Sequence, residues 1–564
     1  MARLVRWQTF LAALGILIVG GLLAQLSLAR QSVIVPVRGG IYVEGVVGTP
    51  QYLNPPLATT DVDRGITSLL FEGLSSLQPD GSVTPALAQS WGVSADGLVY
   101  TCTLRSDIRW HDGEPVTPED VLFTLDLMRS PDLPEPNPLA ELWSRVQIEV
   151  LDSRRLRFTL ERPYAPFLSY TTLPILPAHL LQEIPAAELE ISAYNLSPVG
   201  TGPFRFVQIQ EDEDGTLLLD LEANPFYYRQ TPPIYLEGIQ FRFYRDEGAL
   251  AEALVREEID GAILLSPEAL ERGAERPDLV AYRTYLQAYD ILFLNTQSTL
   301  FADERLRHAI ALGLDRTALV RGFDDRVFLA SGPISPMSWA YKPDLPPFDY
   351  DPEQAATLLE EAGWRDQDGD GIRERDIRSL ELTLLTLDVP PERVILARRI
   401  EQQLAPLGIA VRVVIPEDAE TFRTHLTNRD YDLLLYGWRQ LGGDPDELAL
   451  WHSSQIGPEG SNLSSLQSEE VDNLLEKGRT TLDQNQRTLI YWEFQELFME
   501  EVPAIPLYYP VYTYVVSSRV HEVSLDPLND LGDRFRSVTN WYIKTQKVLL
   551  PGQGRAGPSR QGGR

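Results

Sequence analysis

The segment from Leu380 to Gly437 alternates between apolar runs and amphipathic runs, and this pattern constrains the fold more than any other part of the chain. The expected elements are a strand at 380–387, a helix at 392–404, a strand at 409–415, a helix at 419–428 and a strand at 431–437. Such short links between strand, helix and strand require parallel strands with right-handed crossovers. Ligands of open parallel sheets lie beyond the carboxyl ends of the strands, so the pattern predicts a ligand-facing rim at 438–446.

A second well-defined unit runs from Leu98 to Met128. Side chains alternate from Leu98 to Leu104, which predicts a strand, and Cys102 within it is expected to be a small core residue. Thr117, Pro118 and Asp120 then have the types and spacing of a capped helix start. The helix is expected to pack through one apolar stripe, formed by Val121, Leu122, Leu125 and Met128.

Length and composition limit the classes of protein that the chain can belong to. At 564 residues it exceeds what one core usually holds, so two or three compact units are expected. The formal charge of −32 argues against nucleic acid as a partner, because the phosphates would be repelled. Cys102 is the only cysteine, which rules out a disulfide or a cysteine-rich metal site within one chain.

Several enzyme classes lack their motifs in this sequence. No lysine follows a glycine, so there is no Walker A loop, and neither HExxH nor GxSxG occurs. His111-Asp112 stands in a turn between strand and helix, where a structural role is expected. The run Asp366 to Gly371 resembles the start of a calcium loop, but Ile377 stands where the loop needs a glutamate. We expect an acidic turn without a metal or cofactor there, with calcium as the alternative.

Both ends of the chain carry signals. Arg3 and Arg6 precede a mostly apolar run at 9–24, and 27–29 has the form of a cleavage site. Residues 1–30 are therefore expected to be an export signal or an uncleaved membrane anchor, and either places the body outside the cytoplasm. No cysteine lies near the cleavage site, so a lipoprotein is not expected. Residues 549–564 are expected to be a disordered basic tail, either solvated or in contact with anionic lipid.

Three sequence motifs resemble those of a known protein family. They are the run from Ala95 through Trp110 to HDGEPVTPEDV at 111–121, the PVGTGPF motif at 198–204, and the spacing of Asp303, Arg305, Arg307, Ala309, Asp315 and Arg316. These motifs resemble those of the family 5 extracellular solute-binding proteins, the oligopeptide- and dipeptide-binding subunits of ABC importers.

The resemblance implies an α/β fold, a two-lobe clamshell of the type II periplasmic-binding-protein kind. The first lobe is expected at 31–290 and 507–548, with an extra subdomain at about 56–195, and the second lobe at 291–506. Two segments, 289–295 and 503–516, are the candidate hinges. Two crossings between lobes allow closure about a hinge.

The resemblance also implies ligand-binding residues. Trp438 and Tyr508 or Tyr509 align with positions that line the peptide pocket of the family, and the loop 49–55, with Asn54, corresponds to a segment that turns into the cleft. Tyr289 and Asn295 are further candidates, with hinge packing as the alternative. Aromatic side chains with polar tips suit amphipathic ligands, although a core role is the alternative for such residues.

One position departs from the peptide-binding members. Three residues after the tryptophan they carry an aspartate that neutralises the α-ammonium of the peptide, and here the residue is Leu441. A buried ammonium without a carboxylate would be costly. Asp444 is one possible replacement, whereas Arg439 would instead favour an anionic ligand.

The expected function is therefore an extracytoplasmic, monomeric binding protein of an ABC importer and not an enzyme. It would capture peptides and deliver them to permease subunits served by a separate ATPase. The alternatives are a non-peptide solute (an oligosaccharide, a nickel complex or an anionic small molecule) or an extracytoplasmic hydrolase.

Overall fold

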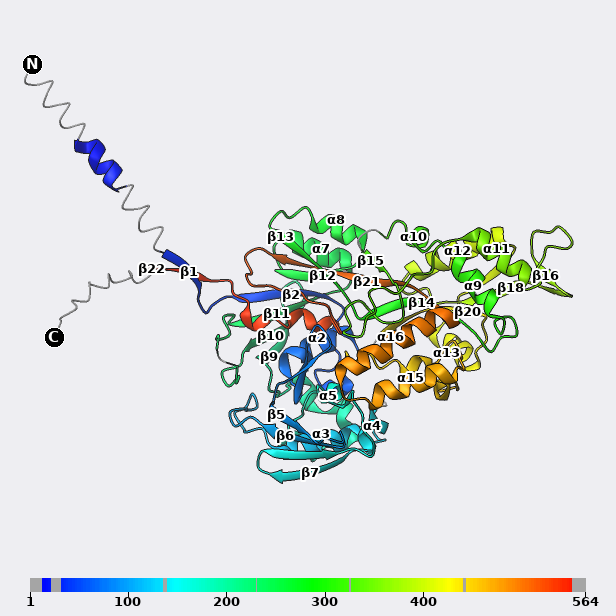
Figure 1. Cartoon of the computed structure of the whole chain (residues 1–564). Coiled ribbons are helices and arrows are strands. Elements are labelled where there is room, and N and C mark those ends of the chain that lie inside the picture. The colour runs from blue at the N-terminus through cyan, green and yellow to red at the C-terminus, as the bar shows by residue number, and fades with distance from the viewer. Residues whose placement is uncertain are drawn as a thin grey trace, which may run out of the picture.

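The computed structural model describes residues 13–21, 32–134, 139–229, 231–323, 326–439 and 443–549. They form a body of mixed helix and strand, from which a two-stranded ribbon projects on the side of the two termini (Figure 1). One long sheet runs through the body in the order β19-β18-β20-β14-β21-β12-β2-β11-β10-β9, and β13 and β15 also pair with β21.

The second lobe contains the predicted parallel unit, which is confirmed. Strand β18 (Glu381–Leu385) pairs in parallel with both β19 (Ala410–Val414) and β20 (Leu433–Arg439). Helices α12 (Glu392–Leu404) and α13 (Ala419–Asn428) make the two crossovers. Gly408 turns the chain between α12 and β19 with a φ of +76°, a conformation that favours glycine.

Helices cover both faces of this part of the sheet. One face packs against α9 (Glu304–Leu312), α11 (Pro352–Glu361) and α12. The other packs against α14 (Leu448–Trp451), α15 (Glu469–Thr480) and α16 (Gln484–Glu501). Apolar side chains of these helices cover both faces, as two-sided burial of a largely parallel sheet requires.

The first lobe is built on the other half of the long sheet. Its strands are β2 (Ile41–Val47), β9 (Phe204–Glu211), β10 (Leu217–Ala223), β11 (Gly238–Tyr244), β12 (Gly261–Leu264) and β13 (Leu279–Tyr285). Its longer helices are α2 (Asp61–Leu70), α7 (Glu247–Val255) and α8 (Pro267–Gly273). A buried cluster around Tyr42, Phe241 and Trp541 fills this lobe.

The extra subdomain is a separate four-stranded antiparallel sheet in the order β5-β6-β8-β7. Its strands are β5 (Ala88–Val93), β6 (Val99–Leu104), β7 (Gln147–Asp152) and β8 (Arg155–Thr159), and the hairpin of β3 (Ser75–Leu77) and β4 (Val83–Pro85) lies beside it. Helix α3 (Pro118–Met128) begins with the predicted capping box of Thr117 and Asp120. Of its expected stripe, Leu122 is only half-buried. Cys102 is fully buried, and burial raises the pKa of its thiol to about 12.

Several shorter elements also lie among the described residues. The short α-helices are α4 (Ala140–Ser144), α5 (Phe167–Tyr170), α6 (Ala178–Leu181) and α10 (Arg316–Leu319). The 3-10 helices are η1 (Pro55–Leu57), η2 (Ala186–Ile191), η3 (Ala193–Leu196), η5 (Ala405–Leu407), η6 (Ser453–Gln455), η7 (Leu531–Phe535) and η8 (Val538–Asn540). The short strands are β15 (Val327–Leu329), β16 (Glu374–Arg375) and β17 (Arg378–Ser379).

Strand β21 (Ala504–Ser517) belongs to both lobes. Its first residues pair with β14 (Ala288–Leu294) in the second lobe, and its last ones pair with β12 and β13 in the first. The chain also passes between lobes at Leu286 and Gln287, between β13 and β14. This crossing precedes the 289–295 segment expected as a hinge, which is instead a fully paired strand of the second lobe.

Strands β1 (Ser32–Pro36) and β22 (Thr545–Leu549) form the projecting ribbon and pair antiparallel with each other. Residues 13–21 are an exposed helix, whereas the predicted cleavage site at 27–29 and the tail from 550 lie outside the described residues. Among the helices that the structure describes, none combines the length and the apolar character needed to cross a bilayer.

Candidate functional site

Four of the predicted site residues, Tyr289, Trp438, Tyr508 and Tyr509, lie on three neighbouring strands. The three tyrosines are buried, Tyr508 in the core on one face of the sheet and Tyr289 and Tyr509 in the core on the other. Strand β14 runs antiparallel to β20, so its first residues lie beside the last residues of β20, and Tyr289 is the register partner of Trp438. Strand β21 brings Tyr508 opposite Asp290, with Tyr509 next to it in the chain. Trp438 lies at the carboxyl end of β20, where the sequence pattern predicts the rim.

One face of the rim carries an ion pair behind Tyr508. The Arg393 Nε atom donates to Asp290 Oδ1 at 2.6 Å, and the guanidinium lies over the ring of Tyr436 at 5.5 Å. A Cβ on Gly437 would lie 2.0 Å from an Arg393 nitrogen, so any side chain there would displace the guanidinium. The pKa of the Tyr508 hydroxyl is raised by burial and by the nearby Asp290 carboxylate. The Arg393 and Asp290 charges therefore neutralise each other behind Tyr508.

The opposite face carries a buried polar cluster. Tyr509 donates to the carbonyls of Gly332 and Ile334, and its ring meets Tyr289 edge-on at 6.3 Å. The Tyr289 hydroxyl is buried and has no hydrogen-bond partner among the described residues. Glu447 accepts from Trp451 Nε1 at 3.2 Å, and burial raises the pKa of its carboxyl to about 8. Glu447 is therefore largely protonated at neutral pH, a feature that the sequence did not reveal.

Asp444 is held by an ion pair within the second lobe. Both of its oxygens accept from Arg487, at 2.8 and 2.7 Å, and both side chains are nearly buried. Burial raises the pKa of the Asp444 carboxyl, although Arg487 opposes the shift. An ammonium group at Asp444 would have to compete with this guanidinium.

The two lobes touch beside the rim. A Cβ added to Gly81, at the tip of the β3–β4 hairpin, would lie 2.5 Å from the Gly443 carbonyl oxygen. The Tyr164 hydroxyl donates to Asp446 Oδ2 at 3.2 Å. Arg479 Nε donates to both carboxylate oxygens of Asp446 at 2.8 Å. The backbone N–H of Ala165 donates to the Arg479 carbonyl at 2.7 Å. The structure thus shows lobes in contact.

A cavity of about 710 Å³ adjoins this contact. The subdomain and the second lobe share its lining, which includes Tyr164, Tyr170, His452, Lys477 and Arg479. Sequence reasoning missed these residues. The one signal was the PYAPF run at 163–167, whose meeting with Asp446 depends on the packing of distant segments.

Residues 82–457 match the family described as bacterial extracellular solute-binding proteins, family 5 middle. The chain belongs to this family. Its mixed α/β fold is the two-lobe clamshell of the solved family members.

Three relatives illustrate the match. The oligopeptide-binding protein AppA from Bacillus subtilis (strain 168) is 29% identical over 528 residues, which cover 92% of this chain and 94% of AppA. The structure of AppA in complex with a nonapeptide gives a TM-score of 0.70 at 27% identity, covering 90% of this chain and 100% of that chain. Di/tripeptide-binding protein 2 from Pseudomonas aeruginosa (strain UCBPP-PA14) is 30% identical over 485 residues, covering 82% of this chain and 87% of the relative. NikZ from Campylobacter jejuni in complex with Ni(L-His) gives a TM-score of 0.72 at 26% identity, covering 89% and 99%.

Other predicted residues do not join the rim of this solute-binding protein. Asn54 is buried in the first lobe and donates to Asn195 at 3.0 Å. Asn295 follows the far end of β14, where its amide donates to the carbonyls of Arg429 and Tyr431. Both amides have structural contacts that tie loops together. The Arg439 side chain and residue Leu441 lie outside the described part of the structure.

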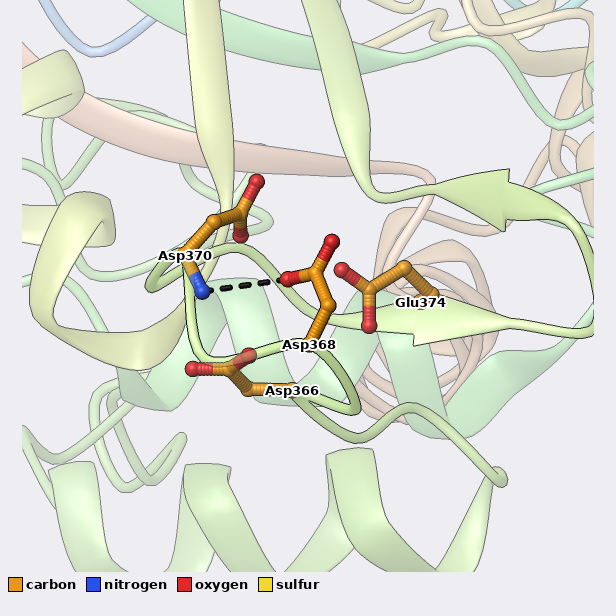
Figure 2. Close-up of side chains that lie close together, drawn as sticks. All are labelled: Asp366, Asp368, Asp370 and Glu374. Carbon is orange, nitrogen blue, oxygen red and sulfur yellow. Dashed lines mark hydrogen bonds between the residues drawn. The ribbon is translucent and has the colours of Figure 1, made fainter.

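The acidic turn after α11 brings four carboxylates together, as Figure 2 shows for Asp366, Asp368, Asp370 and Glu374. Their oxygens lie within 4.8 Å of one another. Each aspartate accepts backbone N–H groups of the same turn; Asp366, for example, accepts from Gly369 and Gly371. These bonds explain the aspartates as turn-forming residues, and the expectation of a turn without a metal stays a prediction.

Replacing Glu447 by glutamine should change how stability depends on pH. An unfolded glutamate loses its proton near pH 4.5, whereas the native carboxyl keeps it to about pH 8. The native state therefore binds more protons in this window, and its stability falls with rising pH by about 1.4 kcal/mol per unit. Glu447→Gln removes this fall. The free energy of unfolding of the variant should therefore rise relative to that of the parent as the pH increases from 5 to 8. Urea unfolding across this range measures the difference; parallel curves would contradict the buried, protonated state.

Proposed function

We propose that this protein is the substrate-binding subunit of an ABC importer, which captures a peptide between its two lobes and delivers it to a membrane permease. The relatives above are named for binding oligopeptides and di- or tripeptides, and the AppA structure holds a nonapeptide. A solute that contacts both lobes would favour the closed form, which then docks on the permease. ATP hydrolysis would belong to another chain, because this one lacks a Walker A loop.

The observation that carries the proposal is the aromatic rim next to the contact between lobes. Trp438, Tyr289, Tyr508 and Tyr509 come from three strands that meet at this edge. We propose that Trp438, Tyr289 and Tyr509, which share one face of the sheet, line the ligand site together with Arg439. Tyr508 lies on the other face beside Asp290, and Asn54 and Asn295 support the loops behind the site. Large aromatic faces suit the apolar side chains of a peptide, and the polar groups near them would orient its backbone.

Native mass spectrometry of freshly purified protein tests the proposal, since a co-purified peptide would appear as a mass released on unfolding. Incubating that peptide with the protein should leave its mass unchanged. Cleavage products would favour the hydrolase alternative, and release of no peptide together with no binding of a peptide library would reject the peptide ligand.

A non-peptide solute is the second candidate. Leu441 stands where the peptide-binding members carry the aspartate for the α-ammonium, and Asp444 is already paired with Arg487. The related NikZ holds a nickel–histidine complex. A released mass that matches an oligosaccharide, a metal complex or an organic anion would establish this alternative.

The cellular setting follows from the family, whose members are extracellular solute-binding proteins. We propose that residues 1–30 export the chain or anchor it to the membrane without a lipid. A monomer would suffice, because one chain supplies both lobes. Intact-mass measurement of the protein from its native membrane distinguishes cleavage from anchoring.

Replacing Gly81 by alanine should weaken ligand binding. The new methyl group would meet the Gly443 carbonyl oxygen at 2.5 Å and so oppose contact between the lobes. Overpacking of this kind costs about 1–3 kcal/mol, so the affinity should fall about tenfold or more. Calorimetric titration with the co-purified ligand measures the change.

Gly215→Ala is the matched control for this substitution. Gly215 has a φ of +79°, close to the +82° of Gly81, but nothing lies within 4 Å of the position that its new methyl group would take. The backbone strain is therefore similar, while the contact between lobes is untouched. Equal losses of affinity in both variants would show that strain, and not closure, is responsible.

A further inference from the structure

Two buried side-chain amides lie at the crossing between the lobes without a hydrogen-bond partner among the described residues. Gln287, where the chain passes from β13 to β14, is 3% exposed, and Asn529, shortly before η7 in the first lobe, is 8% exposed. The oxygen and the nitrogen of both amides are buried and unpaired within the part of the chain that the structure describes. Buried polar groups of proteins are almost always hydrogen-bonded, so these four atoms need an explanation.

The backbone brings the two amides together. Leu286 and Leu528 are partners in a parallel bridge. The Gln287 N–H donates to the Leu528 carbonyl at 2.7 Å, and the Leu528 N–H donates to the Tyr285 carbonyl at 2.9 Å. Hydrogen-bonded segments of this kind lie about 4.8 Å apart, so the residues that follow the two bridge partners are neighbours as well. These following residues are Gln287 and Asn529.

Both amides turn to the side of the aromatic rim. Leu286 and Leu528 pack together in one small apolar cluster. Successive side chains of an extended segment point to opposite sides, so Gln287 and Asn529 turn away from this cluster. Tyr289 stands two residues after Gln287 and therefore lies on the same side. Its hydroxyl is also buried and unpaired among the described residues, which gathers five such atoms at the crossing.

We propose that Gln287 and Asn529, together with the Tyr289 hydroxyl, form a subsite for a backbone amide of the bound peptide. The inference rests on the function proposed above and adds the chemical group that is recognised. Each side-chain amide offers an acceptor oxygen and a donor nitrogen, which match the N–H and C=O groups of a peptide bond. An ammonium group has only donors and a carboxylate only acceptors, so either would use half of each side chain.

The subsite also couples binding to closure. Asn529 belongs to the first lobe, Tyr289 belongs to β14 of the second lobe, and Gln287 lies on the segment between them. A peptide bond that contacts Asn529 and Tyr289 at once finds both partners only when the lobes touch. Binding there therefore favours the closed form over an open one.

Replacing Gln287 by methionine tests the subsite, because methionine keeps the length of the side chain and removes its amide. The probe is trialanine or a nonapeptide of alanine and serine, whichever the parent protein binds more tightly. Calorimetric titration should show an affinity about tenfold below that of the parent, since a peptide group is left unpaired in the complex. Without peptide, Gln287→Met should be as stable in urea as the parent, because the amide has no partner to lose. Asn529→Leu should behave in the same way.

Gln495→Met is the matched control. Gln495 is fully buried too, but its amide donates to the carbonyls of Ala340 and Tyr491 and accepts from the Lys342 N–H. This variant should lose stability and keep the affinity of the parent for the probe. The two methionine variants therefore exchange their effects.

Ester analogues of the probe show whether the contact is to a backbone amide. Each peptide bond of the probe is replaced in turn by an ester, which removes its N–H group. For at least one position the parent should bind the ester about tenfold more weakly than the amide. Gln287→Met should bind the same two compounds with equal affinity, because the side chain that senses the N–H is gone.

The outcomes separate this inference from the proposed function. Unchanged affinity of both Gln287→Met and Asn529→Leu would overturn the subsite and leave peptide binding intact. A loss of stability like that of Gln495→Met, again with unchanged affinity, would show that the amides hold ordered water only, which overturns the subsite as well. A parent protein that binds neither probe would overturn the proposed function and this inference with it.

Discussion

Replacing Glu44 by alanine is expected to lower the free energy of unfolding by about 3–5 kcal/mol, because it leaves the buried Arg534 guanidinium without a counter-ion. Glu44 is fully buried in the first lobe and accepts from Arg534 Nε at 2.7 Å. Its other oxygen accepts from the hydroxyls of Tyr42 and Tyr514, at 2.7 and 2.9 Å. Burial raises the pKa of the Glu44 carboxyl, and the arginine opposes this. The cluster ties β2, β21 and η7 together, so its loss should be felt throughout the lobe.

The size of this effect is measured by urea unfolding of the ligand-free protein. Glu149→Ala is the control, because Glu149 pairs with Arg157 on the surface and such pairs contribute about 0–1 kcal/mol. The double replacement of Glu44 and Arg534 by methionine should cost much less than Glu44→Ala, since no unpaired charge then remains buried. A double variant as unstable as the single one would show that packing of the tyrosines, and not the ion pair, dominates.

Replacing Asp444 by alanine is expected to destabilise the second lobe by about 3–5 kcal/mol for the same physical reason. The bidentate pair with Arg487 joins the loop before α14 to helix α16, and Arg487 also lies over the rings of Trp339 and Tyr491. Removal of the carboxylate therefore leaves a buried cation next to the contact between lobes. Asp430→Ala, at an exposed aspartate paired with His425, should change stability by less than about 0.5 kcal/mol.

Ligand binding by the Asp444→Ala variant separates two roles for this residue. We expect a peptide with a free amino group and its N-acetylated form to lose affinity to the same degree, because Arg487 already occupies both oxygens of Asp444. Calorimetry with the two peptides at a temperature where the variant is folded makes the comparison. A loss confined to the free-amino peptide would instead establish Asp444 as the replacement for the aspartate missing at Leu441.

Local pattern was enough to predict the parallel core of the second lobe. The bounds of α12 and α13 agree with the sequence prediction, because apolar spacing and short links act within a few residues. The capping box at Thr117 and the buried Cys102 are equally local. The position of Trp438 at the end of β20 also followed from sequence, since the end of a strand is set by the strand itself, whereas a role of the aromatic residues in ligand binding stays a prediction.

Features that depend on distant segments could not be predicted in the same way. The ribbon joins residues at opposite ends of the sequence, and β1 has little polar alternation to mark its faces. The partner of Asp444 is Arg487, and the sequence alone does not show which of the many arginines pairs with this aspartate. Asn54 and Asn295 were assigned by family resemblance to the ligand site, but their amides bind neighbouring loops, and hydrogen-bond partners of this kind are settled only by packing.

The strand shared by both lobes makes the order of synthesis matter. Strands β12 and β13 precede the second lobe in the chain, yet their partner, residues 511–517 of β21, is made only after the whole second lobe. Until then the first lobe has an open sheet edge, which is prone to pairing with other chains. A nascent or truncated chain that stops before Ala504 therefore exposes an edge of the first lobe that is an aggregation hazard, so the first lobe depends on a strand made after the second lobe.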